Sequence, residues 1–414
     1  MNVSFIGVGD ELLLGQVVDT NSVRAAEYLF SLGLSIQKKY CVQDRQEEII
    51  KVLAQASLDS DVILISGGLG PTRDDITKEA LAAFLAVPLV YSDRCELHVK
   101  QYLEKRGISM NEIQKVQCYI PENAVLLENP LGTALGIFIE HGGKVYCAMP
   151  GVPYEMDFIL QNSLSEHLGW LGRQGGLLHE SILIGGIGET AIAEIIEPLL
   201  TDLPEAIKLA YLPSIGTVTL RLTGDEKLGV DLKENIKHYM ERIKTALDKN
   251  VLADSSLPLA LILGRRLKAL GLTLSTAESC TGGLISHRIS SHPGSSDYFL
   301  GGVVSYSNLM KEKVLSVPEQ TIEERGVVSE ETVKMMLLGA CSVSGSDIAI
   351  ASTGIAGPGG GTEENPVGTV WIAVGNSKQM RVKKLQLKSD RTRNIEAATN
   401  QSFLLALEHL QYLQ

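Results

Sequence analysis

Residues Asp61–Ser66 read DVILIS, an apolar run that stops at Gly67-Gly68. The run is too short for a helix and is bounded by glycine, which is typical of a strand buried in a parallel sheet. A similar run at Val3–Val8 precedes an amphipathic stretch at 21–32 with Val23, Ala26, Leu29 and Phe30 on its inward face, and Thr77–Leu85 has a helical pattern. Repeated strand–loop–helix units predict an open parallel sheet, whose ligands bind at the carboxyl ends of its strands.

The chain is too long for one ordinary core. Its 414 residues correspond to two or three domains of roughly 150 residues each. A composition with 44% hydrophobic residues, 5% aromatics and 40 glycines favours α/β packing with glycine-rich connections. Breaks in the pattern predict three domains, at 1–169, 170–252 and 253–414.

The net charge, the hydropathy and the cysteines indicate which partners and which compartment to expect. The net charge is −12, and an acidic chain repels a phosphate backbone, so no nucleic-acid partner is expected. No apolar run approaches the roughly 18–20 residues that span a bilayer, and no basic region precedes an apolar stretch at the N-terminus. Six scattered cysteines without a CxxC pair predict reduced thiols. We therefore expect a cytoplasmic protein without a membrane partner.

The middle segment has the pattern of a small α+β domain. Its Gly185-Gly186-Ile187-Gly188 has the GXXG form of a KH module, which binds single-stranded nucleic acid. Residues 171–250 nevertheless hold nine basic against twelve acidic residues and no basic strip. A tight turn into a helix is the alternative interpretation, and the one that the charge favours.

The segment Leu272–Thr276 predicts a strand that runs into Ala277-Glu278-Ser279-Cys280-Thr281-Gly282-Gly283 and then a helix. Small residues at such a turn leave backbone N–H groups free, and a helix N-terminus favours an anion. A serine there could attack a substrate while N–H groups stabilise an oxyanion. Ser279 or Thr281 could equally be a helix cap.

A serine nucleophile needs a base. Lys311 follows a predicted strand at Gly301–Ser305, and burial would lower its pKa enough for that role; a solvated helix lysine is the alternative. A glycine-rich segment, Ser352–Gly361, follows another strand. Arg391, in a later loop, could clamp a phosphate or simply lie on the surface.

The motifs AESCTGG, YSNxxK, STGIAGPGGG with PVGTVW, and SDR resemble, in this order, the nicotinamide-mononucleotide (NMN) deamidase domain of the CinA (competence/damage-inducible) family, over about 255–414. The resemblance implies hydrolysis of NMN to nicotinic acid mononucleotide and ammonia by a Ser/Lys amidohydrolase without a cofactor. It implies Ser279 as nucleophile, Lys311 as base and Tyr306 as an aid to proton transfer or orientation. Cys280 is a rival nucleophile. The implied substrate contacts are Glu278, Cys280, Thr281, Gly282, Gly283, Asn308, Thr353, Gly354 and Arg391.

Loops after the first predicted strands carry a second constellation, in Gly7–Gln16 and Gly67–Thr77. Glycines, a threonine hydroxyl and carboxylates suit a Mg²⁺-like ion with a diphosphate. The alternative is that Asp74, Asp75 and Thr77 only cap the next helix.

With the loops at 129–134 and 149–156, these segments resemble the N-terminal domain of the same family, which has the molybdopterin-binding fold. The resemblance implies an ADP-ribose pyrophosphatase that yields AMP and ribose 5-phosphate with a divalent metal ion (Mg, Mn or Co). Leu135 replaces the proline of the family's Gly-Thr-Ala-Pro-Gly loop, which could loosen that wall. The implied metal ligands are Glu11, Asp74 and Asp75, and the implied substrate contacts are Gly67, Gly68, Gly70, Thr72, Gly132, Thr133 and Glu155.

The sequence thus predicts an α/β protein with a molybdopterin-binding-like parallel-sheet domain, a KH-like α+β domain and an α/β deamidase domain. A homodimer acting on NMN and ADP-ribose is expected. One alternative is a deamidase whose N-terminal domain only binds a nucleotide or pterin. Another is a binding protein whose C-terminal domain is only a scaffold, which the Ser279/Lys311 pair disfavours. A nucleic-acid-associated competence factor is disfavoured by the acidic charge.

Overall fold

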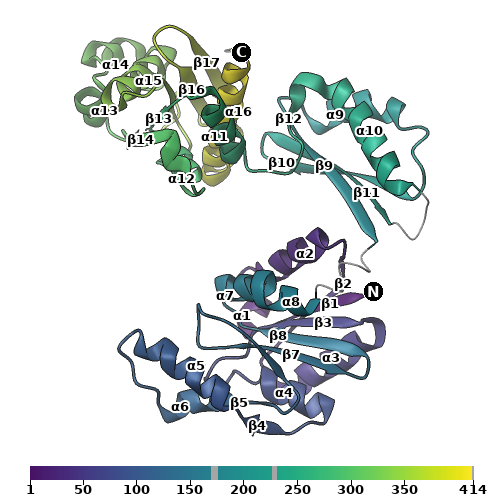
Figure 1. Ribbon diagram of the computed structural model, residues 1–414. Coiled ribbons are helices and arrows are strands. Elements are labelled where there is room, and N and C mark those ends of the chain that lie inside the picture. Colours follow the sequence, from purple (N-terminus) through teal and green to yellow (C-terminus); the bar gives the residue numbers. More distant parts are fainter. Residues whose placement is uncertain (169–175, 226–230, 413–414) are drawn as a thin grey trace. The chain divides into compact units, whose positions relative to one another are not determined.

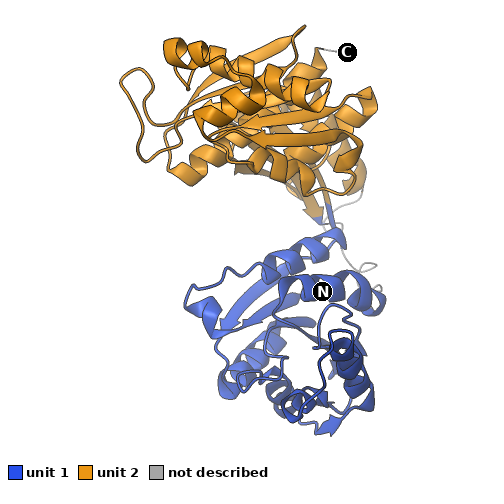
Figure 2. Cartoon of the chain, turned by 90° about the vertical axis from the view of Figure 1, so that its left-hand side faces the viewer, with its two compact units in different colours: residues 1–178, 225–227 blue, residues 179–224, 228–414 orange. Residues whose placement is uncertain are grey.

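The structure is a computed structural model that describes residues 1–168, 176–225 and 231–412. It divides into two compact units, one built mainly from residues 1–178 and the other from residues 179–224 and 231–412 (Figures 1 and 2). The predicted domain boundary at 169/170 lies outside the described residues.

The first unit is built on a six-stranded sheet with the order β2-β1-β3-β8-β7-β6. The strands β2, β1, β3 and β8 pair in parallel, and β7 and β6 add an antiparallel edge. The strands are β1 Val3–Val8, β2 Ile36–Val42, β3 Val62–Ser66, β6 Val125–Leu127, β7 Gly136–His141 and β8 Lys144–Met149. The helices are α1 Asp10–Leu13, α2 Asn21–Ser31, α3 Gln46–Asp59, α4 Thr77–Leu85, α5 Asp93–Glu104, α6 Glu112–Lys115, α7 Pro153–Phe158 and α8 Leu164–Leu168.

Alternate residues of β1 and β3 point to opposite faces of this sheet, and helices cover both faces. Val3 and Phe5 pack with Leu29 of α2 and Met156 of α7, whereas Ile6 packs with Leu53 of α3 and with α4. Figure 1 shows α2, α7 and α8 on one side of the sheet and α3 and α4 on the other. The unit is therefore a three-layer α/β/α domain.

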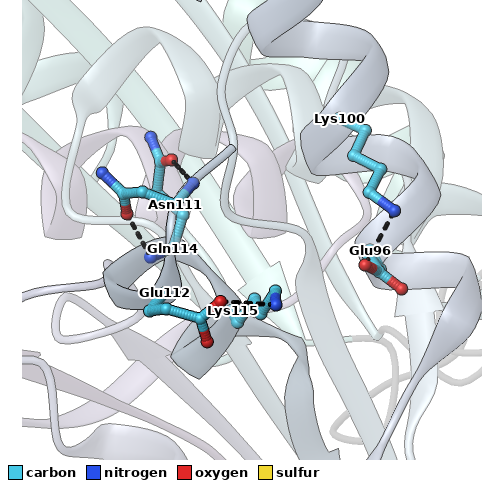
Figure 3. Close-up of polar contacts among 6 residues, drawn as sticks. All are labelled: Glu96, Lys100, Asn111, Glu112, Gln114 and Lys115. Carbon is cyan, nitrogen blue, oxygen red and sulfur yellow. Dashed lines mark hydrogen bonds and ion pairs between the residues drawn. The ribbon is translucent and has the colours of Figure 1, made fainter. Parts of the chain in front are cut away.

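A small subdomain extends from this sheet through α5, α6 and a two-stranded sheet of β4 Leu89–Tyr91 and β5 Tyr119–Pro121. Asn111 caps α6: its side chain accepts from the backbone of Gln114, whose side chain accepts from the Asn111 backbone. Figure 3 shows this capping box beside the i,i+3 pair Glu112–Lys115 and the i,i+4 pair Glu96–Lys100. Reciprocal capping satisfies two backbone donors that a four-residue helix would otherwise leave open.

The second unit begins with a four-stranded sheet in the order β10-β11-β9-β12. Its elements are β9 Leu177–Gly185, α9 Glu189–Ile196, β10 Ile207–Ser214, β11 Thr217–Asp225, α10 Leu232–Leu247 and β12 Val251–Ala253. The GXXG segment 185–188 joins β9 to α9, as predicted for a turn into a helix.

A five-stranded sheet in the order β14-β13-β15-β16-β17 follows, with β13 parallel to both β14 and β15. The strands are β13 Leu274–Glu278, β14 Phe299–Val304, β15 Ile348–Gly354, β16 Thr369–Gly375 and β17 Met380–Gln386. The helices are α11 Leu259–Leu270, α12 Leu284–Ser290, α13 Asn308–Leu315, α14 Glu319–Arg325, α15 Glu330–Ser344 and α16 Arg391–Gln411.

The two faces of this sheet differ in side-chain size. Large residues such as Ile348 and Ile350 pack against α11, α12 and α16, while Ala349 and Ala351 face the helices α13 and α15. Gly339 of α15 brings the two helices still closer, because a Cβ built there would lie 2.1 Å from the carbonyl oxygen of Leu315 in α13. This close packing fixes the helix that carries Lys311.

Most sequence-based expectations for these elements are confirmed, including the strand Val3–Val8 and the helix Thr77–Leu85. The expected inward face of α2 is wrong in part. Val23 is 51% exposed and Ala25 is buried instead, because the core-facing stripe is set by Ala25 and Leu29. The strand β10 was not predicted.

Two further expectations concern membranes and thiols. None of the helices in the described part of the chain combines the length and hydropathy that a bilayer span requires. All six cysteines carry free thiols.

The close contact at Gly339 gives a stability prediction. Gly339→Ala should lower the free energy of unfolding by about 1–3 kcal/mol through overpacking, although alanine is the better helix former by about 1 kcal/mol. Urea denaturation measures the change. Gly359→Ala is the matched control, since a Cβ there meets no atom within 4 Å. Equal stability of Gly339→Ala and wild type would contradict the described packing.

Candidate active sites

The first candidate site lies where the chain changes direction across the C-terminal sheet. From β13 the chain proceeds to β14 on one side, and β15 then pairs on the other side of β13. Such a switch point opens a crevice at the carboxyl ends of the strands, where α/β proteins bind ligands. The turn 279–283 leaves β13 at this place.

Ser279 and Lys311 meet at this turn. The Nζ atom of Lys311 lies 3.1 Å from the Oγ of Ser279 and donates to the carbonyl of Ser305 at 2.7 Å. The Lys311 side chain has 0% exposure, and no carboxylate of the described residues forms an ion pair with it. Burial lowers the pKa of Lys311 below the usual lysine value. A lysine buried among neutral partners is suited to accept a proton.

Glu278 holds the turn in place. Its fully buried carboxylate accepts from the backbone N–H groups of Gly283, Ile285 and Ser286 at 2.8–3.0 Å, and from the hydroxyls of Thr281 and Ser286. The expectation that the N-terminus of α12 is open to a substrate anion is therefore wrong, because Glu278 already occupies it. With both oxygens engaged, Glu278 is placed as a positioning residue rather than a substrate contact.

Tyr306 and Arg391 form a second pair at the surface. The Nη2 atom of Arg391 donates to the Tyr306 hydroxyl at 2.8 Å, and Nη1 donates to the carbonyl of Gly357 at 2.7 Å. Tyr306 is 62% exposed, and Arg391 is close enough to the Cys280 thiol to affect its pKa electrostatically. Arg391 is thus fixed in position while its remaining N–H groups stay available near the turn. Asn308, also exposed, begins α13 beside them.

The remaining predicted contacts divide into buried and open positions. Thr353 has 0% exposure, and its hydroxyl donates to the carbonyl of Val327 at 2.8 Å, so it supports the loop before α15. Gly354 ends β15 against the backbone of β16. Gly282 and Gly283 lie on the outer side of the turn, partly or fully exposed. Of these residues, Gly282 faces open space, whereas a Cβ on Gly283 would lie 3.3 Å from the Val304 side chain.

Cys280 is a poor alternative nucleophile. The residue is 6% exposed and belongs to the core cluster beneath the sheet. Burial raises the pKa of its thiol to about 12. Because the thiolate is the reactive form, the geometry disfavours the rival assignment.

The second candidate site lies at the corresponding switch point of the N-terminal sheet, between β1 and β3. A cavity of about 320 Å³ opens there. Gly67 and Gly68 have φ values of +110° and +68°. A Cβ would lie 2.2 Å from the carbonyl oxygen of Val8 in the first case and 2.2 Å from the hydroxyl oxygen of Thr77 in the second, so only glycine fits. The cavity is lined by Glu11, Gly67, Gly68, Gly70, Asp74, Asp75, Thr133 and Glu155 among the predicted residues, and by Asp44 and Gln117, which were not predicted.

Thr72 and Gly132 support the lining without belonging to it. The Thr72 N–H and hydroxyl both donate to Asp75. Gly132 lies against the Glu155 carboxylate, which accepts from Asn129 at 2.7 Å, and burial raises the pKa of Glu155. The loop that contains Leu135 was expected to be a loose wall of this cavity. It is packed instead, because the Leu135 side chain is 5% exposed and belongs to a core cluster.

The predicted metal ligands line one cavity without forming a complete coordination site by themselves. Within residues 1–168, 176–225 and 231–412, no group of three or more His, Cys, Asp or Glu side chains is arranged to hold a metal ion. Glu11, Asp74 and Asp75 share the cavity, and Asp44 joins them from the end of β2. Burial and the neighbouring carboxylates raise the pKa of Asp44. The oxygen donors suit a hard cation, but their positions do not form one coordination site.

Three family models match the chain. "Probable molybdopterin binding domain" covers residues 4–169, "Damage-inducible protein CinA KH domain" covers 179–253, and "CinA C-terminal domain" covers 257–410. The folds of the three parts agree with the α/β, KH-like and α/β classes expected from the sequence.

Two curated relatives match nearly the whole chain, and a solved structure matches part of it. A CinA-like protein of Cytophaga hutchinsonii is 40% identical over 94% of this chain and 93% of its own length. A putative competence-damage inducible protein of Moorella thermoacetica is 40% identical over 98% of both chains. The crystal structure of the competence/damage inducible protein CihA from Agrobacterium tumefaciens is 37% identical and covers 37% of this chain and 99% of its own, with a TM-score of 0.35. The chain belongs to the CinA family.

The network around Glu278 yields a prediction. Glu278→Gln places an amide NH₂ where only donors face it, so the free energy of unfolding should fall by about 1–3 kcal/mol. Urea denaturation measures this, with Glu319→Gln, an exposed first-turn glutamate, as the control that changes little. If Glu278→Gln were as stable as wild type, the carboxylate would not hold the turn as described.

Proposed function

We propose that the C-terminal domain hydrolyses the carboxamide of NMN to nicotinic acid mononucleotide and ammonia. The observation that carries the proposal is the contact of Lys311 Nζ with Ser279 Oγ at 3.1 Å, in a buried setting without a carboxylate partner. An amine of lowered pKa can take the serine proton, and the hydroxyl then becomes a nucleophile.

The reaction proceeds through an acyl-enzyme. Ser279 Oγ attacks the carboxamide carbon as its proton passes to Lys311 Nζ, and the oxyanion accepts from the backbone N–H groups of Cys280 and Thr281, since those of Ser279, Gly282 and Gly283 already have acceptors. Lys311 returns the proton to the leaving nitrogen, and ammonia departs. Water then attacks the ester, giving one proton to Lys311, which returns it to Ser279 Oγ as the acid is released. The sum is NMN plus water to nicotinic acid mononucleotide plus ammonia.

Substrate recognition is assigned to Arg391. Its guanidinium is oriented by Gly357 and Tyr306, and it forms no ion pair within the described ranges. An oriented arginine suits a phosphate, which accepts two parallel N–H bonds. Because Glu278 fills the N-terminus of α12, Arg391 is the better candidate for the phosphate of the substrate.

Activity of single variants tests the Ser/Lys pair. Ser279→Ala should abolish ammonia release from NMN. Lys311→Met and Lys311→Arg should each lower kcat by at least about 10²-fold, since arginine keeps its proton in this pH range. Lys313→Met, on the exposed side of the same helix, is the matched control. Full activity of Lys311→Arg would show that only charge is needed, and an active Ser279→Ala with an inactive Cys280→Ala would move the nucleophile to Cys280.

The pH profile provides an independent readout. Lys311 acts as base only when neutral, so kcat/KM should rise with pH through its pKa. Since burial lowers that pKa, the midpoint of the rise should lie at a pH below the ordinary lysine pKa of about 10.4. The residual activity of Lys311→Met should lack this rise. A profile that the variant leaves unchanged would assign the titration to another group.

A second activity is proposed for the N-terminal cavity: hydrolysis of ADP-ribose to AMP and ribose 5-phosphate. The supporting observation is a glycine-walled cavity of about 320 Å³ at a switch point, of a size that small ligands occupy. Every ionisable side chain that lines it is acidic. A diphosphate would be repelled there without a cation, so a divalent ion is expected to accompany it. The alternative is a domain that binds a nucleotide or pterin without hydrolysis.

Chelation separates the two activities. EDTA should stop ADP-ribose cleavage and leave NMN deamidation unchanged, and excess Mg²⁺ should restore the cleavage. Asp74→Asn should impair only the cleavage. Both reactions are assayed on one preparation, by AMP and by ammonia release. Loss of NMN deamidation in EDTA, or ADP-ribose cleavage that continues in EDTA, would contradict the assignment of the metal to the N-terminal domain. Absence of ADP-ribose cleavage with every divalent metal would favour an N-terminal domain that only binds a nucleotide or pterin.

A further inference from the structure

A cavity of about 420 Å³ lies within the second unit, and neither Ser279 nor Lys311 lines it. Its walls come from the KH-like sheet, through β9 and β11, and from the deamidase helices α11, α12 and α16. None of the predicted site residues lines it. Its volume lies in the range of small-molecule pockets.

The ionisable side chains that line this cavity are an arginine and a histidine. Arg288 of α12 and His292 line it, and no carboxylate does. The Arg288 guanidinium donates to the side-chain carbonyl of Asn400, whose amide group donates to the carbonyl of Ile215 at 2.8 Å. Arg288 forms no ion pair in the part of the chain that the structure describes. An arginine held by a neutral amide keeps its charge uncompensated, which attracts an anion in an otherwise acidic chain.

Hydroxyl donors in the same cavity lack good partners. Thr217 is 7% exposed, lines the cavity, and its hydroxyl makes no hydrogen bond to another described residue. The neighbouring Thr219 hydroxyl reaches Ser256 only at 3.4 Å. The Thr217 hydroxyl is therefore open to the cavity and available to bond a ligand oxygen.

The N-terminus of α11 adds backbone donors. This 12-residue helix begins at Leu259 after Pro258, no side chain caps it, and Leu259 and Ala260 line the cavity. Open N–H groups and the positive end of a helix dipole stabilise a phosphate. Together with Arg288 and Thr217, they form a set of donors from three different elements around one cavity.

The rest of the lining is apolar. Leu183, Leu257 and Phe403 form a surface on which a ring or an aliphatic group would pack. We propose that this cavity binds a small phosphomonoester that carries an aromatic or apolar group, the class to which nucleoside monophosphates belong. The phosphate lies between Arg288 and the N-terminus of α11, and the apolar group lies against Phe403.

Calorimetric titration of the full-length protein with AMP, and with adenosine as the probe that lacks phosphate, tests the proposal. Arg288→Gln should remove one AMP site or weaken it at least about tenfold, because the lost hydrogen bond is to a charged group. Thr217→Val, which is nearly isosteric, should weaken AMP binding at the same site. This variant tests the proposal even if Arg288→Gln does not fold. Arg265→Gln, an exposed arginine of α11 outside the cavity, is the matched control.

Loss of one AMP site in the two cavity variants, with that site intact in Arg265→Gln and indifferent to adenosine, would support the proposal. AMP binding to Thr217→Val and to any folded Arg288→Gln with the number of sites and affinities of wild type would overturn it. So would wild-type protein that binds no AMP at millimolar concentration, or a site that binds adenosine as tightly as AMP.

Discussion

The burial of Lys311 is the constraint on which the C-terminal site depends. An ammonium at 0% exposure, with only the Ser279 hydroxyl and the Ser305 carbonyl as partners, is costly, so the fold favours the neutral amine. The packing that enforces this is extensive. Gly339 lets α13 approach α15, and Glu278 fixes the turn that presents Ser279. The burial of this one amine therefore costs folding free energy, a perturbation of the kind that clusters at functional sites.

Both candidate active sites have the same place in their sheets although their motifs differ. In each sheet the second strand pairs on one side of the first and the third on the other, so the loops diverge and leave an opening. The N-terminal opening is lined by glycine loops and carboxylates, and the C-terminal one by a serine, a lysine and an arginine. The contrast in charge separates their expected chemistry: a diphosphate needs a cation at the first, whereas an amide needs a nucleophile and a base at the second.

The sequence predicted much of this because its signals are local. The run Asp61–Ser66 and the glycines after it defined a buried strand and its loop, and the motifs singled out Ser279 and Lys311, whose side chains lie 3.1 Å apart in the structure. The sequence could not show which groups each side chain would contact in the folded protein. Glu278 reads as a site residue but is bound to backbone N–H groups, and Asp44 reached its cavity only through the pairing of β2 with β1. The cavity at Arg288 is formed by residues far apart in the chain, which no local pattern reveals.

The most direct test of this account is the titration of the Lys311 side chain itself. Proteins labelled with ¹³C and ¹⁵N in lysine, compared between wild type and Lys311→Met to assign the signal, report the protonation of Nζ by NMR as a function of pH. We expect Lys311 to titrate clearly below the ordinary lysine pKa of about 10.4, because burial lowers its pKa. A Lys311 that stays protonated up to that pH would be an ammonium in the working enzyme, and the Ser279–Lys311 contact would then not be that of a nucleophile with its base.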